Sequence, residues 1–144
     1  MMNKLLTISM LLACISAHAK DSGAEPRPYS PQYYACLDKA GPTTFYDQTA
    51  DSNCDAEEVK VQKKRINAAY GKLVKLWKSN PQEIAKLNAA QKAWVQWRDS
   101  TYELLQEAGG TNGQVVYLVS SNFLLRSLVD QANLLETIVA SNGG

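Results

Sequence analysis

The sequence predicts an all-α protein: a small helical bundle of three long helices plus one short N-terminal helix, with one disulfide. Three observations support this fold class. Apolar residues recur three and four positions apart along three long stretches, as they do on one face of an α-helix. Prolines or paired glycines separate these stretches, and no run has the character of a β-strand. The chain has 144 residues, which suits a single domain.

The start of the chain has the pattern of a secretory signal: Lys4, then an apolar run, then a small-x-small cleavage pattern. The apolar run is too short to span a bilayer, so we expect no transmembrane segment. We expect residues 1–19 to be removed after Ala19, which predicts a periplasmic or secreted protein. A competing interpretation is lipid attachment at Cys14, although Leu12 fits a lipoprotein box poorly.

The charge balance narrows the choice of partners. The full chain has 15 basic and 14 acidic residues, and loss of Lys4 with the signal leaves 14 of each. A nucleic-acid-binding protein would normally be basic, and a protein held on membranes by charge would carry a cationic patch. We therefore expect no nucleic-acid partner.

After the signal, residues 20–29 are expected to form a flexible polar linker, and residues 30–144 the helical domain. A short helix should follow, with Ser30 as its N-cap and Pro31 as its first residue, ending near Ala40 before a glycine and a proline. The segment that follows, Thr43 to Asn53, has no sustained period and is interpreted as a loop.

The second helix is expected from about Cys54 to Ser79, and its apolar stripe has one misfit, Lys63. Asn80-Pro81 should end it and start the third helix, which runs to about Ala108 before two glycines. The fourth, from Gln114 to about Ser141, has the fewest charges and should be the most buried. Because the connection at Asn80 is short, the second and third helices are predicted to be antiparallel neighbours.

The stretch 87–99 anchors the predicted core. Its apolar or small residues, Leu87, Ala90, Trp94 and Trp97, are spaced as one face of a helix. A buried indole contributes on the order of 200 Å² of apolar surface, so both tryptophans are expected in the core.

A set of polar and aromatic side chains should come together between the second and third helices: Asn67, Tyr70, Gln91, Trp94, Arg98 and Asp99. The favoured interpretation is a buried clamp whose hydrogen bonds fix the register of the two helices, with Gln62 among the acceptors for Arg98. The alternative is a recognition site in a groove.

Two cysteines remain after signal cleavage, Cys36 and Cys54, which predicts one disulfide in an oxidising compartment. Two cysteines without a histidine rarely form a metal site, so no metal is expected. The remaining chain has no histidine and no phosphate-binding glycine loop. Catalysis by a Ser-His or Cys-His pair is excluded, and we expect neither an enzyme nor a cofactor.

Several motifs occur in an order and spacing that resemble the LprI-like family of small secreted bacterial proteins, named for a lysozyme inhibitor: Ala35-Cys36-Leu37, Cys54, Asn-x-x-Tyr at 67–70, Gln-x-x-Trp-x-x-x-Arg-Asp at 91–99, and Gly109-Gly110. Members often carry two further cysteines, one of them where this chain has Tyr102. The resemblance implies inhibition of an enzyme that attacks or remodels peptidoglycan, and some relatives resemble immunity proteins.

We therefore predict a periplasmic binding protein whose partner is a lysozyme-like or other cell-wall-modifying enzyme. The alternative is a structural or interaction module of the envelope with no inhibitory role.

The predicted contact with that enzyme is the segment between the two cysteines. Phe45 and Tyr46 would be its aromatic anchors, and Asp47 and Asp51 would face a basic or sugar-binding cleft. The alternative is that the two aromatic side chains fold back as a lid on the bundle.

Overall fold

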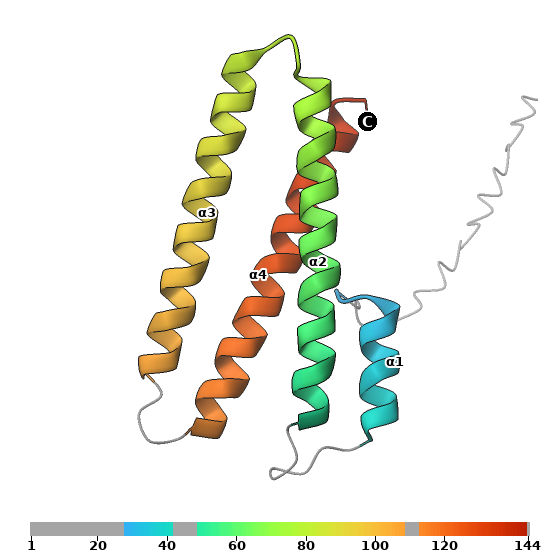
Figure 1. Cartoon of the computed structure of the whole chain (residues 1–144), viewed down its shortest axis with the longest axis vertical. Coiled ribbons are helices and arrows are strands. Elements are labelled where there is room, and N and C mark those ends of the chain that lie inside the picture. Colours follow the sequence, from blue (N-terminus) through green and yellow to red (C-terminus); the bar gives the residue numbers. More distant parts are fainter. Residues whose placement is uncertain (1–27, 42–48, 109–112, 144) are drawn as a thin grey trace, which may run out of the picture.

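The computed structural model describes residues 28–41, 49–108 and 113–143. Within these ranges the chain forms four helices and no strand (Figure 1): α1 (Pro31–Ala40), α2 (Thr49–Leu76), α3 (Pro81–Ala108) and α4 (Gly113–Ser141). The predicted fold class is confirmed.

The helix bounds agree with the sequence where capping residues mark them. α1 and α3 have the predicted bounds, and α4 starts one residue earlier than expected. The predicted start of the second helix near Cys54 was wrong, because α2 begins at Thr49 within the segment interpreted as a loop. A helix extends at little cost once it has formed, even over residues without an apolar period. At its other end α2 stops at Leu76 rather than Ser79.

Specific contacts hold α1, which buries none of its residues. The Ser30 side chain accepts a hydrogen bond from the Tyr33 amide at 3.2 Å, as an N-cap does. At the other end Gly41, with φ at 75°, donates its amide to Leu37. The predicted Cys36–Cys54 disulfide is confirmed and ties α1 to α2.

Two polar contacts reinforce the disulfide. The Glu58 carboxylate of α2 accepts from both the Ser30 amide, at 2.9 Å, and the Ser30 hydroxyl. The Tyr33 hydroxyl donates to Asp55 at 2.9 Å. The short helix is therefore fixed on α2 although it contributes nothing to the apolar core.

The core lies where α2 and α3 pack on α4. α4 contributes the largest share of buried side chains, as its low charge predicted. The central cluster is made up of Ile66, Ala69, Leu73, Leu87, Leu128, Ala132, Leu135 and Val139. α2 and α3 run antiparallel as predicted, but they are not packed side by side: each packs against α4, which lies between them in Figure 1.

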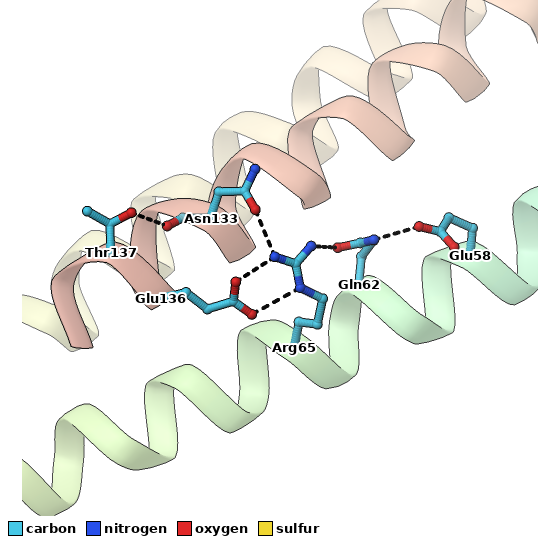
Figure 2. A network of polar contacts seen from close by, with 6 residues as sticks. All are labelled: Glu58, Gln62, Arg65, Asn133, Glu136 and Thr137. Carbon is cyan, nitrogen blue, oxygen red and sulfur yellow. Dashed lines mark hydrogen bonds and ion pairs between the residues drawn. The ribbon is translucent and has the colours of Figure 1, made fainter. Parts of the chain in front are cut away.

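A polar network fixes α2 on α4. Figure 2 shows Arg65 of α2 reaching Glu136 and Asn133 of α4; its Nε donates to Glu136 Oε1 at 3.0 Å and its Nη2 to Asn133 at 2.7 Å. Its Nη1 donates to Gln62, whose own amide donates to Glu58, and both of these residues are buried. The hydrogen bond with Glu136 raises the pKa of Arg65, so the guanidinium stays charged. The sequence had instead predicted a polar clamp between the second and third helices.

Candidate functional site

A groove of about 430 Å³ opens between α2 and α3. Its floor is Leu128 of α4. Its walls are formed by Lys63, Ile66, Asn67 and Tyr70 of α2, and by Asn88, Gln91, Trp94, Val95 and Arg98 of α3. The residues on each wall recur at spacings of three and four, so each wall is one helix face.

The groove exists because α3 leans away from α2 with distance from their connection (Figure 1). Both helices bury their apolar stripes on α4 rather than on each other. Near the connection, the Tyr70 hydroxyl donates to Asn88 Oδ1 at 2.6 Å and bridges the two walls. Lys63 and Arg98 are the lining residues farthest from the connection, so they lie at the opposite end.

Most of the predicted polar set lines this groove. Asn67, Tyr70, Gln91 and Trp94 lie along it together with Arg98, whereas Asp99 does not line it. Neither the side chain of Asn67, which is exposed, nor that of Gln91, which is half-buried, makes a hydrogen bond within the described part of the chain. These residues therefore line an open groove and do not form the buried clamp that was favoured.

Arg98 does not reach Gln62, and that expectation was wrong. Its Nε and Nη2 donate to Asp99 Oδ1 at 2.8 and 2.6 Å, and its guanidinium carbon lies 4.8 Å from the centre of the Trp94 ring. Gln62 instead belongs to the network of Arg65 on the α4 side. Arg98 is therefore held in place by its own helix.

The apolar stripe of α3 is only partly buried. Leu87 is buried, as predicted, whereas Trp94 is half-buried and packs against the core cluster. Ala90 is exposed, and Trp97 is 54% exposed with its ring edge-to-face with Phe123 at 5.4 Å. The prediction that Ala90 and Trp97 lie in the core was wrong, because α3 packs on one helix instead of two.

Two cationic side chains line the groove, and one of them, Arg98, is paired with Asp99. Lys63 and Arg98 line it, and among the residues that the structure describes no aspartate or glutamate does. Lys63 has no ion pair within the described ranges. In the sequence this lysine appeared only as a break in an apolar stripe, and its place in the groove gives that break an explanation. Asn88 was missed, although its position level with Tyr70 across the turn could have indicated it.

Other site residues lie beyond what the structure describes. Phe45, Tyr46 and Asp47 are outside the described residues, and so is the side chain of Asp51, whose backbone belongs to α2. Within residues 28–41, 49–108 and 113–143, no group of His, Cys, Asp or Glu side chains could hold a metal ion. In the same ranges no helix has the length and apolarity needed to cross a membrane.

Comparisons with known proteins give one positive result. No curated protein and no solved structure matches the chain. The model of the family described as lysozyme inhibitor LprI matches residues 39–135, which include α2, α3 and most of α4. That match covers more than half of the sequence and includes every residue that lines the groove. The chain therefore belongs to the lysozyme inhibitor LprI family.

Proposed function

We propose that this protein acts in the periplasm or outside the cell, where it binds and inhibits a lysozyme-like or other peptidoglycan-cleaving enzyme. The observation that carries the proposal is the match of the lysozyme inhibitor LprI family over residues 39–135. The signal-like start of the sequence supports the location.

The chemistry of the chain favours binding over catalysis. The only histidine of the sequence lies in the expected signal, and both remaining cysteines are joined in a disulfide. The groove contains amide, phenol and cationic side chains but no carboxylate, within the described residues. Glycoside hydrolysis normally needs two carboxyl groups across the scissile bond. The groove is therefore suited to holding a ligand.

We place the contact with the enzyme at the segment between the two cysteines. The disulfide closes this part of the chain into a covalent loop, which limits the conformational entropy lost on binding. Phe45 and Tyr46 supply aromatic anchors, and Asp47 and Asp51 supply charge for a basic or sugar-binding cleft.

The test is an inhibition assay with purified protein. The rate at which lysozymes of different classes clear a suspension of bacterial cell walls is measured over a range of protein concentrations. Dose-dependent inhibition of at least one enzyme is expected. Binding to an enzyme without inhibition would instead favour an envelope interaction module.

The contact itself is tested with two variants that should keep the fold. The double variant Phe45→Ala, Tyr46→Ala should lose inhibition while its thermal midpoint stays unchanged. Lys64→Met, at an exposed position of α2 outside the groove, is the control and should inhibit normally. If the double variant loses stability but still inhibits, the two aromatic side chains form a lid and the enzyme binds elsewhere.

A further inference from the structure

The groove between α2 and α3 contains polar side chains without hydrogen-bond partners in the described residues, and an enzyme bound at the 42–53 segment would not account for them. The Lys63 ammonium, the Asn67 amide and the Gln91 amide have no hydrogen-bond partner within the described residues. Arg98 uses Nε and Nη2 on Asp99, and no hydrogen bond from its Nη1 occurs in the same ranges. The groove thus offers several hydrogen-bonding groups to a ligand.

These groups are arranged by chemistry along the groove. Lys63 and Arg98 lie at the end far from the α2–α3 connection, and the amides of Asn67 and Gln91 lie nearer to it. The guanidinium of Arg98 rests on Trp94, which fixes the position of one positive charge. A ligand that matches this order has a carboxylate at one end and amide or hydroxyl groups at the other.

The remaining surface is apolar and small. Ile66 and Val95 lie on opposite walls and Leu128 forms the floor, so a methyl group or the C–H face of a sugar ring would be covered. The volume of about 430 Å³ is within the range of small-molecule sites, roughly 300–1,000 Å³. Each of the two amide side chains offers both a donor and an acceptor, as an acetamido group requires.

We propose that this groove binds an acidic N-acetylated amino sugar. Its carboxylate pairs with Lys63 and with Nη1 of Arg98, and its acetamido group bonds with the amides of Asn67 and Gln91. The acetamido methyl lies against Ile66 and Val95. Two sources supply this chemistry: N-acetylmuramic acid from bacterial cell walls and N-acetylneuraminic acid from animal glycans. The proposal does not depend on enzyme inhibition.

The experiment is isothermal titration of the purified protein with four sugars, without any enzyme present. N-acetylmuramic acid and N-acetylneuraminic acid carry both groups, N-acetylglucosamine has only the acetamido group, and glucuronic acid has only the carboxylate. Saturable binding is expected for at least one of the first two. That sugar identifies the source, and the two single-group sugars should bind about tenfold more weakly or worse.

Variants assign the binding to the groove. Lys63→Met keeps the apolar stem of the side chain and removes its charge, and it should weaken binding by about tenfold. Lys64→Met, at the adjacent exposed position outside the groove, is the matched control and should bind as the parent does. Asn67→Ala, also at an exposed position, should weaken binding independently of charge.

Thermal midpoints and circular dichroism verify that each variant is folded before it is compared. The proposal is overturned if neither acidic N-acetylated sugar binds, if N-acetylglucosamine binds equally well, or if Lys63→Met and Lys64→Met behave alike. Because no enzyme is present, these results are independent of whether the protein inhibits a lysozyme.

Discussion

The Tyr70 hydroxyl and Asn88 Oδ1, 2.6 Å apart, join α2 and α3 at the end of the groove nearest their connection. Tyr70→Phe should therefore widen the groove at that end. Because this hydrogen bond is exposed to solvent, the free energy of unfolding should fall by no more than about 1 kcal/mol. Urea denaturation measures the stability, and a loss much larger than this would show that the bridge holds the bundle together.

The disulfide should matter most to α1. Its two cysteines are 18 residues apart in the sequence, and α1 buries no residue of its own. Replacing both Cys36 and Cys54 by Ala should cost about 3 kcal/mol in the chain-entropy model. Hydrogen exchange should show faster exchange of α1 amides and little change in α4. Equal protection of α1 amides in the parent and the variant would mean that the contacts of Ser30 and Tyr33 are enough to hold α1 on α2.

The two arginines should respond differently to replacement by lysine. Arg65→Lys removes the planar fork that joins Glu136, Asn133 and the buried Gln62, and it should cost about 1–3 kcal/mol because the buried Gln62 Oε1 loses its hydrogen-bond donor. Arg98→Lys is the comparison variant: the Arg98 side chain is 14% exposed, but its hydrogen bonds within the described residues go to Asp99, an exposed residue of the same helix, so it should cost less than Arg65→Lys. Thermal unfolding of both variants measures the two losses of stability. A larger loss for Arg98→Lys than for Arg65→Lys would contradict the role of the network in Figure 2 in holding α2 on α4.

The two tryptophans of α3 form a second matched pair. Trp94 packs against the core cluster, so Trp94→Ala should destabilise the protein by about 3 kcal/mol. Trp97 is 54% exposed, so Trp97→Ala should cost about 1 kcal/mol. Chemical denaturation monitored by circular dichroism avoids dependence on tryptophan fluorescence. Equal costs would indicate that Trp97 has a packing partner beyond Phe123.

Stability should also fall at high pH through Tyr29. Burial raises the pKa of Tyr29 above its ordinary value of 10.0, and the nearby Arg126 partly opposes this shift. A raised folded-state pKa means that this contribution to stability is complete below pH 10.0 and is lost as pH rises through the folded-state pKa. Between pH 9 and pH 11, Tyr29→Phe should lose less stability than the parent. Parallel pH curves would contradict burial of the phenol.

The parts of the fold that local chemistry controls could be predicted from the sequence. Ser30-Pro31 and Asn80-Pro81 start helices α1 and α3 where expected, because a cap and a proline act on the adjacent turn alone. The disulfide followed from the only two cysteines outside the expected signal segment. The start of α2 was misplaced because the segment before Cys54 lacks an apolar period.

Features that depend on packing between distant segments could not be predicted. Nothing near Trp97 in the sequence shows that α3 would pack on α4 alone and leave this indole half exposed. The partners of Arg65 on α4 are 68 and 71 residues away along the chain, beyond the reach of any periodic pattern. Most polar residues of the groove were identified from the sequence. Whether they would form a buried hydrogen-bonded clamp or line an open groove depended on the tilt of α3, which the sequence does not show.

The central position of α4 has a consequence for the order in which the protein folds. α2 and α3 bury their apolar faces on α4, the last helix of the chain, and have little surface to share with each other. During synthesis, α2 and α3 therefore lack their packing partner until α4 has been made. Until α4 is available, these apolar faces stay exposed to water, and the packed core can form only when all three long helices are present.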